Sequence, residues 1–308
     1  MPDHHHPAAK SLGVYCLAND RVIEWFHMFA RSLRHFNPDL PLTVIPYNAD
    51  FARLKQLAPR YHFDLVSEAE AARFEVLEPK IMKMNRHAGM FRKWASFFGP
   101  YDEFILFDAD IAIAMPLDSI FSAFTRSQKD FLYFDTDITM VYRPEHAAMM
   151  QAKYGSPGFN AGTFGSRKGV ITEATLWEMA DRAEAVRHLF EPMQVDQPFL
   201  NYVFDTLPRS MTSLHDLLPE LSPKPWARVP FQLDPSTSRA KDAEGYQMPF
   251  IHWAGCHYPI MVRKEVFLHY RTLDVNPVQK LACRSQFYRR RWTKRIHQIL
   301  GKFMPVNA

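Results

Sequence analysis

Residues 103–113, with the sequence EFILFDADIAI, constrain the fold more than any other segment of the chain. The turn-forming pair Gly99-Pro100 precedes four consecutive apolar residues, and these lead directly into Asp108 and Asp110. A short apolar run bounded by turn residues is typical of a strand that is buried on both faces. Such strands belong to parallel sheets that are covered by helices. The segment therefore predicts a buried parallel strand with two carboxylates at its end.

The first third of the chain alternates apolar runs with helical patterns. We predict strands at 14–18, 42–45, 63–66, 131–134 and 248–253. We predict helices at 22–36, 51–57, 87–98, 120–124, 172–189 and 198–204, where apolar residues recur at spacings of three and four. Alternation of strand and helix is the pattern of a doubly wound α/β sheet. Residues 207–247 show no convincing periodicity and predict a long, partly irregular region.

The charge of the chain is unevenly distributed. Of its 37 Lys and Arg residues, seven lie between 284 and 302, where no acidic residue occurs. Residues 285–303 predict a basic helix with an aromatic face that could lie on an anionic membrane surface. That face could instead dock onto the domain and leave the charges in solvent. No nucleic-acid-binding module accompanies the helix, so we expect no nucleic-acid partner.

The three cysteines, Cys16, Cys256 and Cys283, are far apart and form no CxxC pair. Reduced thiols and a cytoplasmic location are the simplest interpretation, with peripheral attachment at the inner face of the membrane as a further option. The start of the chain has no apolar run typical of a signal peptide, and His4-His5-His6 predicts a solvated tail. No apolar stretch approaches the ~20 residues that a membrane span needs.

The carboxylates of Asp108 and Asp110 are separated by one residue and can converge on one ion at the end of a strand. A hard cation with oxygen ligands, Mn²⁺ or Mg²⁺, suits such a pair and usually also holds phosphates. A solvated strand end is the alternative. Asp135 and Asp137 form a competing pair, for which we expect a solvated or acceptor-facing role. Only the first pair follows a predicted helix with basic residues in its middle, at 92–93.

In their order and spacing, several segments resemble the family 8-type glycosyltransferases, which belong to the nucleotide-diphospho-sugar transferase superfamily and have a GT-A fold. The matching segments are 18–20 (AND), 92–94 (RKW), 107–110 (FDAD), 159–162 (FNAG), 196–201 (DQPFLN) and, in part, 252–255 (HWAG). The resemblance implies one Rossmann-like α/β domain at 12–270, with a mixed, mostly parallel central sheet flanked by helices. A disordered tail at 1–11 and a basic helical extension at 271–308 complete the predicted organisation.

The resemblance also implies an activity, which is transfer of a sugar from a nucleotide-diphosphate sugar, with UDP-sugar as the expected donor. The acceptor is a hydroxyl of a glycan, a lipid-linked sugar or a protein, and the anomeric configuration is retained. The implied metal ligands are Asp108, Asp110 and His252. The implied donor contacts are Ala18, Asn19, Asp20, Arg92, Lys93, Asp108, Ala109, Asn160, Ala161, Gly162, Gly255 and Tyr258. The implied catalytic residues, near the anomeric carbon, are Asp196 and Gln197.

Each of these assignments has a structural alternative. Asp20 and Asp196 could cap helices, Arg92 or Lys93 could lie on a solvated helix face, and His252 could be a core histidine. An amide is a poor nucleophile, so we favour a mechanism in which the leaving phosphate helps to deprotonate the acceptor over a covalent intermediate on Gln197.

One position departs from the family pattern His-x-x-Gly-x-x-Lys-Pro, in which the lysine contacts the pyrophosphate. Tyr258 stands at the lysine position here and supplies no positive charge, although His257, Arg263 or Lys264 could compensate. A catalytically weak or inactive nucleotide-sugar-binding protein is therefore an alternative function. A DxD phosphatase is less favoured because strands precede the aspartate pair, and a sugar nucleotidyltransferase because no Gly-rich loop follows the first strand.

Overall fold

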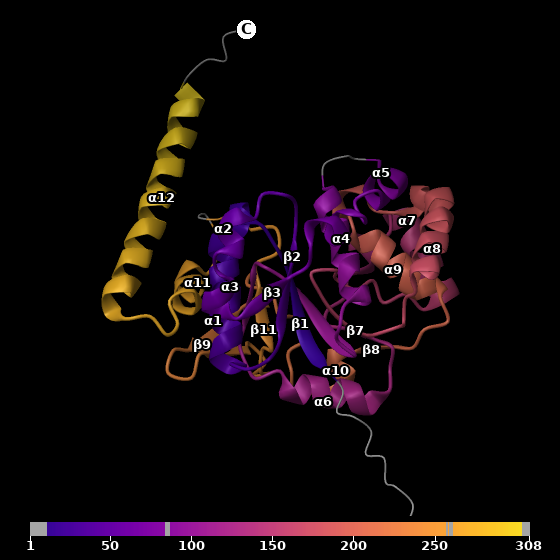
Figure 1. Ribbon diagram of the computed structural model, residues 1–308, viewed down its shortest axis with the longest axis horizontal. Coiled ribbons are helices and arrows are strands. Elements are labelled where there is room, and N and C mark those ends of the chain that lie inside the picture. Colours follow the sequence, from indigo (N-terminus) through magenta and orange to yellow (C-terminus); the bar gives the residue numbers. More distant parts are fainter. Residues whose placement is uncertain (1–10, 84–86, 257, 259–260, 304–308) are drawn as a thin grey trace, which may run out of the picture.

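The computed structural model describes residues 11–83, 87–256, 258 and 261–303. A seven-stranded sheet lies at the centre, with helices on both sides of it (Figure 1). The strand order is β3-β2-β1-β4-β7-β6-β8, in which β7 runs antiparallel to both of its neighbours while the other pairs are parallel. The predicted mixed, mostly parallel sheet is confirmed.

The strands of the central sheet are β1 (Leu12–Ala18), β2 (Leu42–Pro46), β3 (Phe63–Leu65), β4 (Glu103–Asp108), β6 (Phe131–Tyr133), β7 (Thr163–Arg167) and β8 (Met211–Ser213). Two further pairs are formed by β5 (Ile111–Ile113) with β11 (Phe250–His252) and by β9 (Phe231–Asp234) with β10 (Arg239–Asp242). The α-helices are α1 (Ile23–Phe36), α2 (Ala52–Lys55), α3 (Ala58–Tyr61), α4 (Glu68–Ala72), α5 (Leu77–Ile81), α6 (Asp118–Ser127), α7 (Pro144–Tyr154), α8 (Glu173–Val186), α9 (Gln197–Thr206), α10 (Leu214–Leu217), α11 (Lys264–Arg271) and α12 (Pro277–Phe303). Short 3₁₀ helices are η1 (Asp20–Val22), η3 (Ile138–Met140), η4 (Arg187–Leu189) and η5 (Pro192–Gln194), and a longer one is η2 (Ala88–Phe98).

Strand β4 is buried on both faces, as the apolar run predicted. Phe104 and Leu106 belong to the core on one side of the sheet, whereas Ile105 and Phe107 belong to the core on the other side. All four side chains are at most 1% exposed. The alternation follows from strand geometry, since successive side chains point to opposite faces. The strand therefore fixes where Asp108 leaves the sheet.

Several expectations about elements differ from the structure, and the helices α4, α5 and α7 were not predicted. The predicted helix at 87–98 is the 3₁₀ helix η2 (Ala88–Phe98), although an α-helix was expected. Strand β7 was missed because its sequence, TFGSR, has none of the apolar clustering that marks a buried strand. The region 207–247 contains β8, α10 and the β9–β10 hairpin, so it is less irregular than expected. Strands β7 and β8 are short, and both pair with strands that are distant in sequence.

The C-terminal helix α12 begins beside α11, on the left of the view, and extends away from the domain (Figure 1). Side chains are described as far as residue 290. Phe287 is 1% exposed, and its ring lies 5.3 Å from that of Tyr258 and 5.8 Å from that of Phe267. The first turns of the aromatic face thus dock onto the domain. Among the described residues, no helix is both long and apolar enough to cross a membrane.

Ser11, the first described residue, is joined to the domain. Its backbone N–H donates to the Asp102 carboxylate at 2.9 Å, and its hydroxyl donates to the Pro100 carbonyl. The predicted disordered tail therefore does not include Ser11, and the rest of that tail lies outside the described residues.

Arg92, on η2, connects three elements. Its Nε donates to Glu75 at 2.6 Å, its two Nη atoms donate to Glu68 at 2.8 and 2.7 Å, and Nη1 also reaches the Pro46 carbonyl at 2.9 Å. The guanidinium is only 3% exposed, while the two carboxylates are about a third exposed. A buried guanidinium is tolerated because these partners use its donors. Arg92 thus joins η2 to α4 and to the end of β2.

We expect Arg92→Met to lower the free energy of unfolding by about 2 kcal/mol. Fully buried ion pairs lose about 3–5 kcal/mol when one partner is removed, but Glu68 and Glu75 can be partly hydrated. Urea denaturation measures the change. Arg73→Met is the matched control, because Arg73 makes an exposed ion pair with Glu173 and its removal is expected to cost below about 1 kcal/mol. Equal effects of the two variants would contradict this role of Arg92.

Candidate active site at the carboxyl ends of β1 and β4

Asp108, Asp110 and His252 converge at the end of β4. One ligand atom from each residue lies within 4.8 Å of the other two. Asp108 is the last residue of β4, and β5 starts at Ile111, directly after Asp110. His252 pairs with Ile111 across the β5–β11 ladder, and the Trp253 N–H donates to the Asp110 carbonyl at 3.0 Å. This strand pair therefore brings His252 to the aspartates from 142 positions further along the chain.

The electrostatics of these groups are strongly coupled. Burial raises the pKa of Asp108 to about 6, against the opposing charge of Lys93. Burial also opposes ionisation of Asp110, but nearby His252 outweighs it and holds the pKa of Asp110 below its usual value. Burial opposes protonation of His252 as well, yet Asp110 and then Asp108 raise its pKa. Two carboxylates and an imidazole form a donor set that fits Mn²⁺ or another divalent ion.

Gly162 gives these groups the room that they occupy. A Cβ atom at this position would lie 2.6 Å from His252 Cε1, 2.8 Å from Asn160 Oδ1 and 3.0 Å from Asp108 Oδ2. Its carbonyl also accepts from the Asp108 N–H at 2.8 Å. Any side chain at this position would displace these groups. The FNAG segment therefore needs a glycine at position 162, because His252 and Asp108 lie so close to its backbone.

Lys93 lies at the centre of the site. Its Nζ is 3.0 Å from Asp108 Oδ1 and 3.2 Å from Asp196 Oδ2, and it donates to the Ala161 carbonyl at 3.0 Å. The side chain is 6% exposed. Burial alone would lower the pKa of Lys93, but the two carboxylates raise it, so the ammonium stays charged. The alternative of a solvated helix face is therefore wrong for this residue.

Asp196 precedes α9 but does not cap it, since its side chain makes no capping hydrogen bond and instead faces Lys93. Gln197 is held at both ends of its amide: Oε1 accepts from the Ala161 N–H at 3.1 Å, and Nε2 donates to the Met140 carbonyl at 3.0 Å. The first turn of α9 therefore fixes the orientation of the FNAG segment.

Asn201, one turn further along α9, strengthens that connection. Its side-chain amide accepts from the Phe159 N–H and donates to the Phe159 carbonyl, both at 2.8 Å. The two segments that stand apart in the sequence, FNAG and DQPFLN, thus form one unit beside Lys93.

The segment after β1 lies at the same edge of the sheet, because Leu17 pairs with Asp108 in the parallel ladder. The Asn19 carboxamide caps η1 by accepting from the backbone at residues 21 and 22, and Ala18 accepts from the Tyr47 N–H. Asp20 also acts as a cap, but for α2: its carboxylate accepts from the backbone N–H groups of residues 53 and 54. Asn19 and Asp20 thus stabilise the loops beside the candidate metal site.

Arg92 is a correction to the predicted set of donor contacts. Its guanidinium donors are used by Glu68, Glu75 and Pro46, so they are not available to a phosphate. Of the two neighbouring basic residues, Lys93 is the one in the site. The sequence could not separate them, because adjacent residues of a helix point in different directions.

Tyr258 is a second correction. Its ring packs among Trp25, Phe267 and Phe287, with centroid distances of 6.3, 5.6 and 5.3 Å. Burial and then the charge of Glu24 raise its pKa to about 12. Tyr258 therefore belongs to the aromatic contact that holds α12.

The other predicted site positions lie nearby. Ala109 is buried between the two aspartates, and Asn160 accepts from the Gly162 N–H at 2.7 Å. Gly255 has a φ of 66°, in the left-handed region that favours glycine, in the loop after His252. His257 lies outside the described residues.

Two side chains near the cluster were missed as site residues. Burial raises the pKa of Asp135 to about 7, opposed by His252, so the first aspartate of the competing pair lies close to the candidate metal site. Trp226 stacks on His252 with a centroid distance of 5.0 Å and an interplanar angle of 13°. Trp226 lies in the region without periodicity, and no local signal in the sequence could have revealed it.

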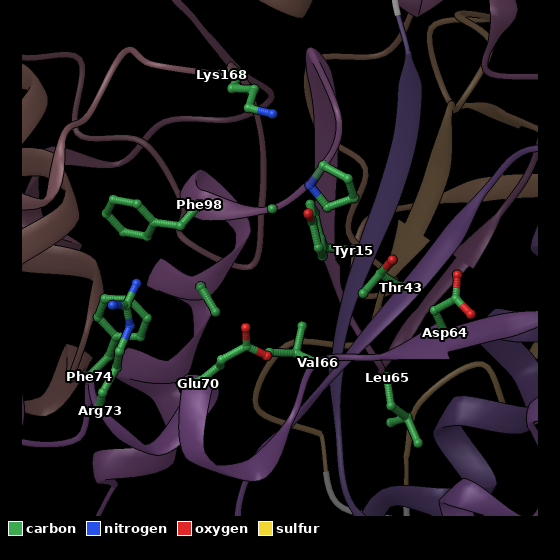
Figure 2. Close-up of a pocket in the computed structure, with 13 residues that line it drawn as sticks. Tyr15, Thr43, Asp64, Leu65, Val66, Glu70, Arg73, Phe74, Phe98 and Lys168 are labelled. Carbon is green, nitrogen blue, oxygen red and sulfur yellow. The ribbon is translucent and has the colours of Figure 1, made fainter.

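A separate cavity of about 540 Å³ lies towards the other end of β4. Figure 2 shows Thr43 and Asp64 on one side of it and Phe74 and Phe98 on the other. Gly99-Pro100, just before β4, also lines it. Its lining includes none of the groups that converge on Asp108, so this cavity is separate from the candidate site.

No protein-family model matches the chain, and no curated protein sequence matches it. Solved structures match its fold. The galactosyltransferase LgtC, in complex with donor and acceptor sugar analogues, aligns at 14% identity over 86% of this chain and 97% of that chain, with a TM-score of 0.52. The bifunctional glycosyltransferase WbbM aligns at 13% identity over 86% of this chain and 50% of that chain, with a TM-score of 0.55.

These similarities show that the chain has the GT-A glycosyltransferase fold, as the resemblance in sequence predicted. The chain spans about half the length of WbbM. At these identities the match concerns the fold, and the activity has to be argued from the site.

We expect Gly162→Ala to weaken Mn²⁺ binding at least about tenfold, because the added methyl group displaces His252 or Asp108 and a shift of this kind in a metal site typically costs about 10–100-fold in affinity. Calorimetric titration with Mn²⁺ measures the change. Gly165→Ala is the control. Gly165 lies on β7, its Cβ would meet Leu132 and the Phe104 carbonyl, and the substitution should leave Mn²⁺ affinity unchanged. Wild-type affinity in Gly162→Ala would contradict the site.

Proposed function

We propose that this chain is a metal-dependent glycosyltransferase that transfers a sugar from a UDP-sugar to an acceptor hydroxyl with retention of anomeric configuration. One observation carries the proposal: in a GT-A fold, Lys93 joins Asp108, a member of the three-residue metal cluster, to Asp196. Ligands of open α/β sheets bind beyond the carboxyl ends of the strands, which is where these groups lie.

The metal ligands in this proposal are Asp108, Asp110 and His252, and the ion is Mn²⁺ or Mg²⁺. When bound, the ion offsets the negative charge that grows on the diphosphate as the sugar leaves. The β5–β11 pairing holds the ligands together before any ion binds. Trp226, stacked on His252, limits the rotation of the imidazole.

The donor would lie across the ends of β1 and β4. In this proposal Asn19 and Asp20 flank the base and ribose, with Ala18 beneath them. The segment Asn160-Ala161-Gly162 faces the sugar, where the glycine allows the backbone to approach closely. Lys93 keeps that segment in place through its contact with the Ala161 carbonyl.

Asp196 and Gln197 are the proposed catalytic residues. The bond between the anomeric carbon and the phosphate oxygen breaks, and the bond to the acceptor oxygen forms on the same face of the sugar. The acceptor proton passes to an oxygen of the leaving diphosphate. The Asp196 carboxylate would stabilise positive charge on the sugar. Both ends of the Gln197 amide are already hydrogen-bonded, which favours a positioning role over a nucleophilic one.

The packing of Tyr258 favours one alternative, a nucleotide-sugar-binding protein with little or no turnover. In that case the donor would bind with Mn²⁺ but its sugar would not be transferred. A phosphatase or a sugar nucleotidyltransferase fits the site less well. Neither function explains why Gln197 contacts the FNAG segment, which also lies against the metal cluster at Gly162.

We expect Asp110→Ala to lower sugar transfer at least about a hundredfold, since a metal ion contributes several kcal/mol to such a step. Turnover of UDP-sugars with Mn²⁺ provides the assay, after a thermal-shift panel of nucleotide-sugars with and without Mn²⁺ has selected the donor. Asp64→Ala, which removes an exposed carboxylate on β3, is the control and should keep full activity. Absence of stabilisation by every nucleotide-sugar would refute the proposed function, and stabilisation without turnover would support the binding protein.

We also propose that the extension at 271–308 brings the catalytic domain at 12–270 to an anionic membrane, which would suit a lipid-linked or surface glycan as acceptor. The support is the run of basic residues without an acid between 284 and 302. Phe287 is buried against the domain and fixes only the beginning of α12. Most of the basic residues follow Phe287, so its burial does not conflict with membrane binding.

Replacing Arg291, Lys294 and Arg295 by Gln should weaken binding to phosphatidylserine-containing vesicles at least about tenfold, since each basic residue near such a surface contributes about 1 kcal/mol. Vesicle sedimentation measures binding, with neutral phosphatidylcholine vesicles for comparison. A variant with Arg126, Arg239 and Lys241 replaced by Gln removes the same charge from exposed positions of the domain and should bind like the wild type. Equal binding to both vesicle types would exclude the membrane role.

A further inference from the structure

The proposed donor site has more negative than positive charge. A nucleoside diphosphate adds its own negative charge to Asp108, Asp110 and Asp196. The proposed divalent ion and Lys93 together offset only part of this charge, and Lys93 already pairs with two of the carboxylates. The family pattern supplies a lysine at the position of Tyr258, which here packs among aromatic rings. Another positively charged side chain close to the loop after His252 would offset the remaining negative charge of the diphosphate.

The segment 225–228 runs directly beside that loop. The His252 N–H donates to the Pro225 carbonyl at 2.8 Å, and the Ala227 N–H donates to the His252 carbonyl at 2.9 Å. Trp226, between them, stacks on the His252 ring. Backbone and ring contacts therefore fix the position of the segment relative to a proposed metal ligand, up to the residue before Arg228.

Arg228 reaches from this segment to the loop after His252. Its Nη2 lies 3.5 Å from the Gly255 carbonyl and 3.9 Å from Cys256 Sγ, both at the outer limit of a hydrogen bond. It would also lie 3.8 Å from a Cβ atom placed on Gly255. The residue is exposed. Within the described part of the chain, no carboxylate forms an ion pair with it, so its guanidinium can take an anionic partner.

The other basic residues named as substitutes for the lysine have different contacts. The Arg263 guanidinium lies 5.0 Å over the Phe231 ring, and its Nη2 donates to the Val229 carbonyl. The Lys264 ammonium lies 5.3 Å over the Tyr288 ring. These contacts occupy both side chains, and His257 lies outside the described residues, so Arg228 is the stronger candidate.

We infer that Arg228 binds the diphosphate of the donor and of the leaving group. Arg228, at the end of the segment 225–228, thus supplies the positive charge that Tyr258 lacks. The inference rests on the proposed function. A guanidinium suits this role because its planar donors bind two phosphate oxygens at once and its charge does not titrate near neutral pH. Exposure of Arg228 before the donor binds is consistent with a group that closes onto its ligand.

The test is calorimetric titration of Mn²⁺ alone, Mn²⁺ with inorganic pyrophosphate, and Mn²⁺ with UDP. The variants are Arg228→Gln, Arg228→Lys and, as a matched control, Arg239→Gln, at an exposed position of β10. Loss of one charge-assisted contact should weaken pyrophosphate and UDP binding about tenfold in Arg228→Gln. Arg228→Lys should recover part of this loss, and Mn²⁺ alone should bind all variants as it binds the wild type.

Two results would overturn the inference while leaving the proposed function intact. One is unchanged pyrophosphate and UDP binding in Arg228→Gln. The other is an equal loss of affinity for Mn²⁺ alone, which would mean that Arg228 acts by positioning His252. A wild-type protein that binds neither pyrophosphate nor UDP with Mn²⁺ would count against the proposed function itself, and the inference would fail with it.

Discussion

The paired charges around Lys93 are the interaction on which the rest of the site depends. Its ammonium group lies between Asp108 on β4 and Asp196 before α9, and it also binds the Ala161 carbonyl. These largely buried charges are tolerated because they compensate each other, whereas removal of the central cation would leave Asp108 and Asp196 without its compensating charge. The same contacts join η2, β4, α9 and the FNAG segment. The packing of these elements and the geometry of the site therefore depend on the same interactions.

A second constraint is the short β5–β11 ladder, which brings His252 to Asp110. The chain that leaves β11 then departs from the family pattern at Tyr258. This ring, together with Trp25 and Phe267, receives Phe287 of α12. Tyr258, which stands where the family pattern has a lysine, therefore adds no positive charge to the proposed donor site but makes an aromatic contact with the C-terminal helix. Arg228 lies beside the loop after His252, next to the segment that Trp226 holds against the His252 ring. In our inference Arg228 supplies the positive charge that Tyr258 does not.

Much of the fold could be predicted because its signals are local. Strand β4 and helix α1 follow from apolar spacing, and the positions of Asp108 and Asp110 follow from where β4 ends. Strand β7 could not be predicted, because Thr163–Arg167 owes its order to neighbours on both sides. The roles of Arg92 and Lys93 could not be separated either. One contacts Glu68 and Glu75 and the other contacts Asp108 and Asp196, and only the packing of η2 decides which side chain faces the site.

By itself the sequence determined the α/β class, the strand that ends in two carboxylates, and the segments that resemble a glycosyltransferase family, because apolar periodicity and short motifs are properties of neighbouring residues. Tertiary structure alone decided that Asp20 caps a helix more than thirty residues away, that Asp196 faces Lys93 instead of capping α9, and that Trp226 and Arg228 lie beside His252. These outcomes depend on contacts between distant segments, and such contacts form only when the whole sheet has brought its strand ends to one edge.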